Sequence, residues 1–486
     1  MTIIPNNDAD VADYAQLRDL FGSSGFTLEA ICQRLGISKL SEVDPLRDRH
    51  RDRPVPDTAG TALIHLFVEG KPIASAAFEV LTGASALLQR LNLISQMNDT
   101  EVAATVALYP IEHLYIASDR YNSADGLAFE GFDDIVYPCL FETSARFIRI
   151  LPRTPCGPVL DLCSGTGVAA LLLAKTSEHT YAADLTERCA QFALFNQRLN
   201  GIVNSSVITG DLYEPVAGLE FDRIVVHPPY QPVFRHAQIF NSGGIDGEQV
   251  TRRCVEEAYD HLRPGGRLYC LAQLTAREQP VEQRVRLWLA GKACDIGFYI
   301  TKRHEIELFA AKATLTNKGS DLDFREWLRA FSRMGVRSLD YGLLIVERHT
   351  EPREPFAVSR KTPDAWEPGD FEANFALEVA RRQPGFEAAL WSRRLRVSSS
   401  AKLEVEHTIG SEGGWQLHQY RITQSGPFDV KINASQGLAH LLALFDGVRT
   451  VEQCLNEMQG SGSSVVRRDF ADTVVAMASE GFLNFV

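Results

Sequence analysis

Several features that define common protein classes are missing from this sequence of 486 residues. Its nine cysteines include no Cys-x-x-Cys pair, so the spacing offers neither a zinc ribbon nor a disulfide framework, and we expect no metal site. The longest apolar runs, such as VAALLLA, fall far short of the roughly 20 residues that span a bilayer. The N-terminal segment carries acids where a secretory signal would carry bases. These absences predict a soluble, cytoplasmic protein with reduced thiols and no membrane partner.

An excess of basic charge is missing as well. The sequence has 49 Lys and Arg against 62 Asp and Glu, a net charge of −13. Because binding to a phosphate backbone relies on Lys and Arg that release counterions, this balance favours a protein or small-molecule partner over nucleic acid. The sequence leaves open whether the protein forms a homodimer. At roughly 150 residues per domain, the length predicts about three domains.

The hydrophobic pattern changes along the chain and divides it into four parts. Residues 1–130 show mostly helical spacing and predict a mainly helical domain. Residues 131–350 alternate apolar strands with amphipathic helices, which is typical of a doubly wound, Rossmann-like α/β sheet, here with seven strands. Residues 351–400 are rich in Pro, Arg and Glu and predict a linker or helical connection. Residues 401–486 predict a small α+β, winged-helix-like module, although a helical cap for the core fits them equally well.

The strongest local signal is VLDLCSGTGVAALLLA at 159–174. An apolar strand runs into Gly165 and Gly167, which permit a tight turn and close backbone approach, and the following helix offers free N–H groups at its N-terminus. Asp184 closes the next predicted strand, where an acid can bind ribose hydroxyls. Up to this point, NAD and S-adenosylmethionine (SAM) fit equally well.

Three further features favour SAM. Asp161 stands four residues before Gly165, Asp211 closes the third strand where it can accept a hydrogen bond from an adenine amino group, and the fourth strand ends in the sequence His-Pro-Pro-Tyr at 227–230. These residues resemble the class I SAM-dependent methyltransferases. Within that class they are similar to the branch with Asn/Asp-Pro-Pro-Tyr, which includes the release-factor glutamine methyltransferases. GGIDGEQVTRR at 243–253 and LRPGGRLYCL at 262–271 extend the resemblance, which covers 141–275 well.

The resemblance implies a set of cofactor contacts. These are Asp161, Cys163, Gly165, Gly167, Asp184, Leu185, Asp211 and Leu212, with Phe141 and Thr143 over the methionine end of SAM. Packing in the core explains Leu212, Phe141 and Thr143 equally well. Asp246 and Glu248 in the Gly-rich loop either meet the substrate or cap the helix that follows.

The same resemblance implies an acceptor site at His227, Pro228, Pro229 and Tyr230. In the related enzymes the Asn/Asp oxygen and the carbonyl of the first Pro accept hydrogen bonds from the amine, the aromatic residue stacks on its planar group, and the prolines stiffen the loop. His227 departs from that pattern. A neutral imidazole offers one acceptor nitrogen, but it can also take a proton near neutral pH, so His227 is either a hydrogen-bond partner or a general base.

We therefore expect SAM-dependent methyl transfer to a nitrogen of a protein side chain or small metabolite. One alternative is an O- or N-methyltransferase of natural products with His227 as base, and another is a nucleic-acid amino-methyltransferase. A third is a SAM- or peptide-binding module without turnover. In the release-factor enzymes an N-terminal helical domain holds the protein substrate, so the resemblance implies a substrate-selecting or lid role for residues 1–130.

Overall fold

A computed structural model describes residues 4–43, 53–75, 77–122, 131–233, 238–316, 321–362, 369–411, 413–462 and 464–486. The chain folds into two compact units, the first of residues 1–296 and 304–357 and the second of residues 297–303 and 358–486. The boundary falls inside one long strand, β11 (Cys294–Glu305), so each unit contains part of that strand. No helix in the described ranges is long and apolar enough to cross a membrane.

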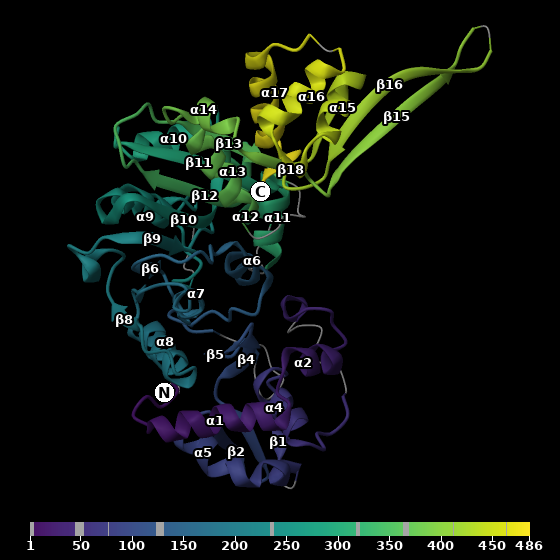
Figure 1. The fold of residues 1–486 in the computed structure, drawn as a ribbon. Coiled ribbons are helices and arrows are strands. Elements are labelled where there is room, and N and C mark those ends of the chain that lie inside the picture. Colours follow the sequence, from purple (N-terminus) through teal and green to yellow (C-terminus); the bar gives the residue numbers. More distant parts are fainter. Residues whose placement is uncertain are drawn as a thin grey trace. The chain divides into compact units, whose positions relative to one another are not determined.

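All of the strands predicted between residues 131 and 350 belong to one sheet, whose order is β13-β11-β12-β10-β9-β6-β7-β8 (Figure 1). Strands β6 to β10 pair in parallel, and β12 joins β10 antiparallel, so the predicted α/β architecture is confirmed. The strands are β6 (Val159–Leu162), β7 (Thr180–Asp184), β8 (Ser205–Thr209), β9 (Phe221–Val226), β10 (Leu262–Ala276), β11, β12 (Ser338–Arg348) and β13 (Ala357–Lys361).

The sheet has one strand more than the seven we predicted. The additional strand, β13, lies in the segment that we expected to be a connection. Its five residues, AVSRK, are too few and too polar to show a strand period against the surrounding Pro, Arg and Glu.

The strand order reverses at β6, which pairs with β7 on one side and β9 on the other. In open parallel sheets, ligands bind at such a point, outside the carboxyl ends of the strands. The turns after β6 and β9 are therefore the expected place for a site.

The helices of this part of the chain are α6 (Glu142–Ile150), α7 (Val168–Leu173), α8 (Glu187–Leu199), α9 (Gln249–His261), α10 (Val281–Trp288), α11 (Ile306–Thr316) and α12 (Asp321–Arg333).

The described residues before 123, which we call the front segment, contain helices and also short strands. Its helices are α1 (Val11–Ser24), α2 (Leu28–Leu35), α4 (Ala59–Phe67) and α5 (Ser85–Arg90), with 3-10 turns at 40–42 and 77–84. Its strands are β1 (Ile73–Ala74), β2 (Ile94–Asn98) and β3 (Glu101–Ala104) in one sheet and β4 (Ala107–Ile111) with β5 (Leu114–Ser118) in a hairpin. The β-branched and aromatic residues of 101–118 explain the strands.

The front segment is joined to the large sheet through two asparagines of α8. The side-chain amide of Asn196 accepts from the Ala117 N–H (2.7 Å) and donates to its carbonyl (2.9 Å). One turn later, Asn200 makes the same pair of bonds to Tyr115 (2.9 and 2.8 Å). The two amides thus occupy the hydrogen-bonding edge of β5 in place of a further strand, and the front segment belongs to the first unit.

The second unit has a core of its own. Leu377, Leu390, Trp391 and Leu395 are all buried in that core. The segment that we predicted as a linker or helical connection contains two helices, and these side chains make it part of the core. The elements of the second unit, in chain order, are α13 (Asp370–Ala380), α14 (Phe386–Leu390), β14 (Arg394–Val397), β15 (Ala401–Ile409), β16 (Trp415–Gln424), β17 (Val430–Ala434), α15 (Gln436–Ala443), β18 (Asp446–Thr450), α16 (Val451–Gly460), α17 (Arg467–Ser479) and β19 (Leu483–Phe485).

Candidate functional site

A cavity of about 620 Å³ opens at the carboxyl ends of β6, β7 and β9. This volume is in the range of small-molecule sites. Of the residues that the sequence predicted, those lining it are Asp161, Cys163, Gly165, Asp184, Leu185, Asp211, Leu212, His227, Pro228, Pro229, Tyr230 and Thr143. The residues predicted to contact the cofactor and those predicted to hold the acceptor therefore line the same cavity.

The glycine turn after β6 lines this cavity. Gly165 has a φ of +52°, and a Cβ added there would meet no atom within 4 Å. Gly167 (φ +75°) does not line the cavity; its Cβ would lie 3.0 Å from the Cβ of Ala193 on α8. The first glycine thus leaves room for a ligand, and the second lets two helices approach.

Two carboxylates stand beside this turn, of which Asp161 is buried and Asp184 is partly buried. Asp161 accepts a hydrogen bond from the Ala170 N–H (3.0 Å), and Asp184 accepts one from the Gly165 N–H (2.8 Å). Burial raises the pKa of both, and the nearby Asp184 charge contributes to a pKa of about 8 for Asp161. Because a cation would stabilise the ionised forms, the pair favours a positively charged ligand with hydroxyl groups.

Asp211 lines the cavity but already has an ionic partner. Its two carboxylate oxygens accept from the guanidinium of Arg253 at 3.2 and 3.0 Å, and Arg253 lines the cavity too. The neighbouring Leu212 is buried with a φ of +49°, so the backbone turns sharply at this point. Asp211 is therefore held in place by a residue that sequence reasoning did not connect to it.

His227 lies in an aromatic environment. Its ring stacks on Phe147 with centroids 5.2 Å apart and contacts Tyr230 at 5.5 Å. Its Nε2 atom is buried with no hydrogen-bond partner among the described residues, and burial lowers the pKa of His227 to about 4. His227 is therefore neutral at physiological pH, with a ring nitrogen left unpaired.

The Gly-rich loop at 243–247 packs against the backbone of Tyr230 and the residues that follow it. The Gly243 N–H donates to the Gln231 carbonyl (2.9 Å), and the Val233 N–H donates to the Gly244 carbonyl (2.9 Å). A Cβ on Gly243 would lie 2.8 Å from the Cα of Tyr230, and one on Gly247 would lie 2.5 Å from its carbonyl oxygen. These glycines are needed because two backbone segments touch.

Some predicted contacts do not line the cavity. Phe141 precedes α6 and packs on Tyr121 and Tyr137, with centroids 5.5 Å from each. Asp246 accepts from the Arg277 guanidinium (2.8 Å). Glu248 is only 3% exposed, and its carboxylate accepts from Arg284 (2.7 and 2.8 Å) and from the N–H and hydroxyl of Thr275. Both acids hold the Gly-rich loop rather than face the hollow.

Sequence reasoning missed several lining residues. They are Asp134, Tyr137, Phe147, Phe240 and Arg253, of which Tyr137 stacks on Phe240 with centroids 4.7 Å apart. Tyr137 and Phe147 lie close in the sequence to Phe141 and Thr143, which we had predicted as contacts, so a search for aromatics around these two residues could have found them. Phe240 is far from them, and Arg253 ends the GGIDGEQVTRR run with no sign that it faces the cavity.

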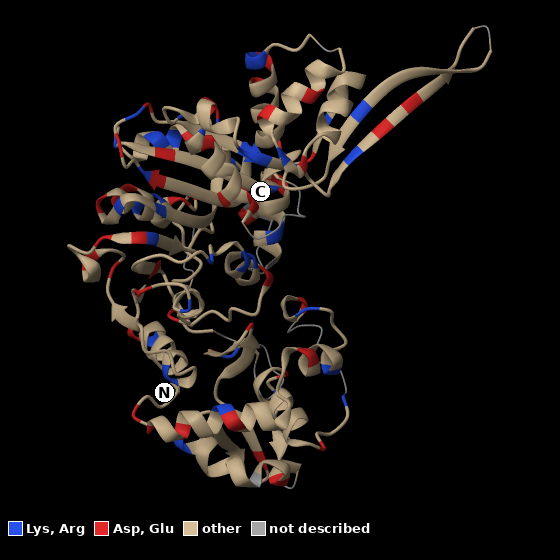
Figure 2. Ribbon diagram, in the orientation of Figure 1, with Lys and Arg blue, Asp and Glu red and all other residues tan. Residues whose placement is uncertain are grey.

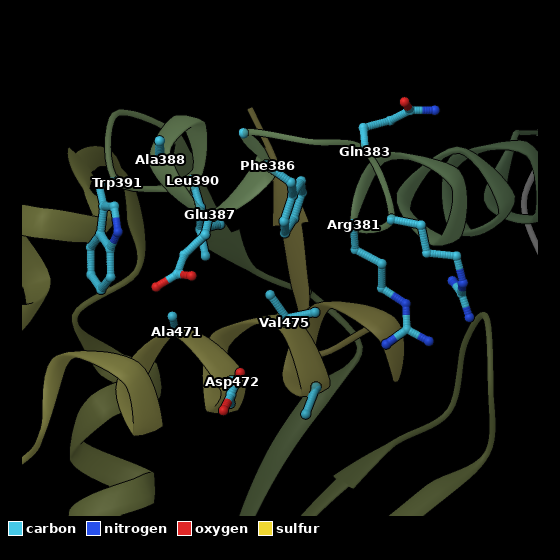
Figure 3. A pocket seen from close by; sticks show the side chains of 13 residues that line it. Arg381, Gln383, Phe386, Glu387, Ala388, Leu390, Trp391, Ala471, Asp472 and Val475 are labelled. Carbon is cyan, nitrogen blue, oxygen red and sulfur yellow. The ribbon is translucent and has the colours of Figure 1, made fainter. Parts of the chain in front are cut away.

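A second hollow, of about 1060 Å³, lies within the second unit between α14 and α17 (Figure 3). Phe386, Leu390 and Val475 line it. Arg381 and Arg382 at its edge are both bound to the buried carboxylate of Glu378, at 2.7 and 2.6 Å. None of the predicted site residues lines this hollow. Among the described residues, no group of three or more His, Cys, Asp and Glu could hold a metal ion.

Residues 141–289 match the family model of the methyltransferase small domain. The ribosomal protein uL3 glutamine methyltransferase of Bradyrhizobium diazoefficiens is 32% identical over 125 residues, which cover 23% of this chain and 39% of that protein. The release factor glutamine methyltransferase of Thermodesulfovibrio yellowstonii is 29% identical over 124 residues, or 23% of this chain and 44% of that protein. The ribosomal RNA small subunit methyltransferase C of Vibrio cholerae is 28% identical over 177 residues, or 35% of this chain and 45% of that protein.

The fold, the cavity and these matches define a class I SAM-dependent methyltransferase domain, as the sequence predicted. Within that class, the domain resembles the glutamine methyltransferases of ribosomal protein uL3 and of release factors. The chain spans less than half the length of each of the three relatives described.

Proposed function

We propose that this protein is a SAM-dependent methyltransferase that acts on a nitrogen atom of a protein side chain or a small metabolite. The observation that carries the proposal is that the glycine turn, its two neighbouring acids and the His-Pro-Pro-Tyr loop all line one cavity. SAM supplies a methyl group on a sulfonium centre. The protein then has to hold and orient the acceptor and exclude water, since the leaving group is already activated.

The residues of the cavity fit SAM. Asp161 and Asp184 suit its positive charge and its ribose hydroxyls, and Gly165 leaves space beside them. The hydroxyl oxygen of Ser164 lines the same hollow, where it is buried with no partner among the described residues. A buried polar atom without a partner is costly, so a ligand that bonds to it stabilises the site.

His227 acts as a hydrogen-bond partner for a neutral nitrogen nucleophile. With a pKa of about 4, its ring is a weak base at neutral pH and would remove a proton poorly from a hydroxyl or an ammonium group. Its unpaired Nε2 is available to accept a hydrogen bond, the task that an Asn/Asp oxygen performs in the related enzymes. This favours the nitrogen acceptor over the alternative with His227 as base.

The ring of Tyr230 forms a flat wall beside His227, and Tyr137 and Phe240 are further aromatic residues of the cavity lining. A planar amide or amine would stack on such a wall. Two of the relatives are named as glutamine methyltransferases of proteins, and the third is named as a methyltransferase of ribosomal RNA. The net charge of −13 favours the protein or metabolite acceptor.

The test is methyl transfer from isotopically labelled SAM to fractionated cell extract. We expect label in the protein or small-molecule fraction, and none with Asp184→Ala, which removes a carboxylate of the cavity. Label in nucleic acid would overturn the choice of acceptor. SAM binding by calorimetry without release of S-adenosylhomocysteine from any fraction would replace the enzyme with a binding module.

A further inference from the structure

Strands β15 and β16 form a two-stranded arm in the second unit, drawn in yellow-green beside α15 in Figure 1. Every residue of β15 after Ala401 is exposed, and so are the first four residues of β16. Only the last residues of β16 pair with a third strand, β17. Because an isolated hairpin is marginally stable in water, an arm of this length is expected to have something to pack against.

The arm is apolar on one face and polar on the other. Residues directly opposite one another share a face of the hairpin. One face carries the pairs Leu403–Ile422, Val405–Tyr420, His407–Leu417 and Ile409–Trp415. The other carries Lys402–Thr423, Glu404–Arg421, Glu406–Gln419 and Thr408–Gln416. We call the first set the apolar face of the arm and the second the polar face.

A β-bulge keeps the apolar face continuous. The register shifts between Glu406 and His407, where β16 advances from Gln419 to Leu417 and leaves His418 unpaired. Without this extra residue, Leu417 and Trp415 would point to the polar face, because side chains alternate along a strand. The bulge thus gathers apolar side chains that the plain alternation would separate.

The apolar face is open while the polar face has its own partners. Leu403, Val405, Ile409, Trp415 and Leu417 are 52%, 44%, 71%, 74% and 48% exposed. On the polar face, Arg421 lies 3.4 Å from the Glu404 carboxylate and 3.9 Å from that of Glu406. Figure 2 shows both acidic and basic residues on the arm, which is unlike the one-sign surface that binds a phosphate backbone.

We propose that the apolar face of the arm binds the same face of a second copy of this chain. The face has no acidic or basic residue apart from His407, so two copies meet without like-charge repulsion. The five exposed side chains offer on the order of 500 Å² per copy, so two copies bury about 1,000 Å², which is the lower limit for a specific interface. A two-fold axis between the arms makes such an interface self-complementary and closed.

The edges of the arm are not part of this interface. Among the described residues, β15 has no strand on its outer side, and β16 has none along residues 415–419. Strands that pair edge to edge lie about 4.8 Å apart in one sheet, whereas packed faces lie about 10 Å apart, so a second arm on the apolar face leaves these edges unpaired. The proposal is independent of the proposed function, since the arm belongs to the second unit and contains no residue of the methyltransferase cavity.

The test measures the mass of the full-length protein by sedimentation equilibrium and light scattering over a range up to about 50 μM. Two double variants are compared, and each adds two positive charges to one face of the arm, one on β15 and one on β16. Val405→Lys with Leu417→Lys alters the apolar face, and Thr408→Lys with Gln416→Lys alters the polar face of the same region. We expect a dimer for the wild type and the polar-face variant, and half that mass for the apolar-face variant.

Thermal unfolding of both variants shows whether they are folded. A second readout is the fluorescence of Trp415, taken as the difference between the wild type and Trp415→Phe, which we expect to shift to the red on dilution as the dimer dissociates. A monomeric wild type at the highest concentration would overturn the proposal and assign the face to a different partner. An apolar-face variant that stays dimeric would place the interface elsewhere and overturn it as well.

Discussion

Asp119 and Arg188 form a buried ion pair that ties the front segment to helix α8. The two residues are 3% and 8% exposed. The Nε–H of Arg188 donates to Asp119 Oδ2 at 2.7 Å, and its Nη2 donates to the other oxygen. The same Oδ2 accepts from the Val136 N–H at 2.8 Å. Since Asp134, Ile135 and Tyr137 line the methyltransferase cavity, this pair fixes one of its walls.

Removing one partner of that pair should destabilise the protein strongly. Asp119→Ala leaves the guanidinium of Arg188 buried without its counter-ion and the Val136 amide without its acceptor. We expect a loss of about 3–5 kcal/mol in the free energy of unfolding, measured by denaturant titration. The control is Asp19→Ala on the exposed side of α1, where the change should stay within about 0.5 kcal/mol. A similar small loss for both variants would contradict the role of the pair.

Activity should vary little with pH through the range in which an ordinary histidine titrates. Because burial lowers the pKa of His227 to about 4, the ring stays neutral from pH 8 down to about 5. We expect a flat kcat over that range, and retained activity in His227→Asn, whose amide oxygen can accept the same hydrogen bond. A decline centred near the ordinary value of about 6.5, together with an inactive His227→Asn, would establish His227 as a general base.

The same histidine should make stability depend on pH. Its pKa is lower in the folded state than in the unfolded state, so between about pH 6.5 and pH 4 the unfolded chain binds the extra proton. Because only the unfolded chain gains this proton, the free energy of unfolding falls by up to about 3 kcal/mol as the pH decreases through that window. His227→Gln, which does not titrate, should flatten the curve of unfolding free energy against pH in that window. Equal curves for both proteins would disprove the lowered pKa.

Gly243→Ala should impair the acceptor site. The new Cβ would lie 2.8 Å from the Tyr230 Cα and 2.6 Å from the Gly247 carbonyl oxygen, so the Tyr230 loop has to move. A displacement of about 1 Å at a reacting group can reduce the rate by roughly 100-fold. We expect a fall of that order in kcat, with binding of SAM unchanged by calorimetry. Gly22→Ala in α1, where a Cβ meets no atom within 4 Å, is the control and should keep full activity.

Arg253→Gln should weaken the binding of SAM. Arg253 holds both oxygens of Asp211, the residue proposed to contact the adenine amino group. Without it the carboxylate is free to turn away, and we expect a rise of about tenfold in KM for SAM with little change in kcat. The neighbouring Arg252→Gln is the matched control, because Arg252 pairs with Glu256 at 2.6 Å and does not line the cavity. An equal effect of both variants would remove Arg253 from the site.

The residues proposed to bind the cofactor could be grouped from the sequence because they lie at the ends of strands. Asp184 is the last residue of β7, Gly165 and Asp211 follow β6 and β8, and the carboxyl ends of parallel strands meet at one edge. The sequence pattern is therefore enough to bring them together.

The remaining contacts depend on packing that the sequence does not show. Glu248 carries the same charge whether it faces a substrate or a buried arginine, and Arg284, its partner, lies 36 positions away. Arg253 and Asp211 are 42 positions apart. The strand β13 and the core residues Leu377 and Trp391 were hidden for a related reason, since a polar, Pro-rich composition masks short elements that are buried by their neighbours.

The asparagine contacts between α8 and β5 have a consequence for synthesis on the ribosome. Ala117 and Asn196 are 79 positions apart, so β5 emerges long before the helix that completes its hydrogen bonds. During that interval one edge of the β4–β5 hairpin is unpaired and open to association with other nascent strands. The outer edge of β5 therefore gains these hydrogen-bond partners only when α8 has folded against it.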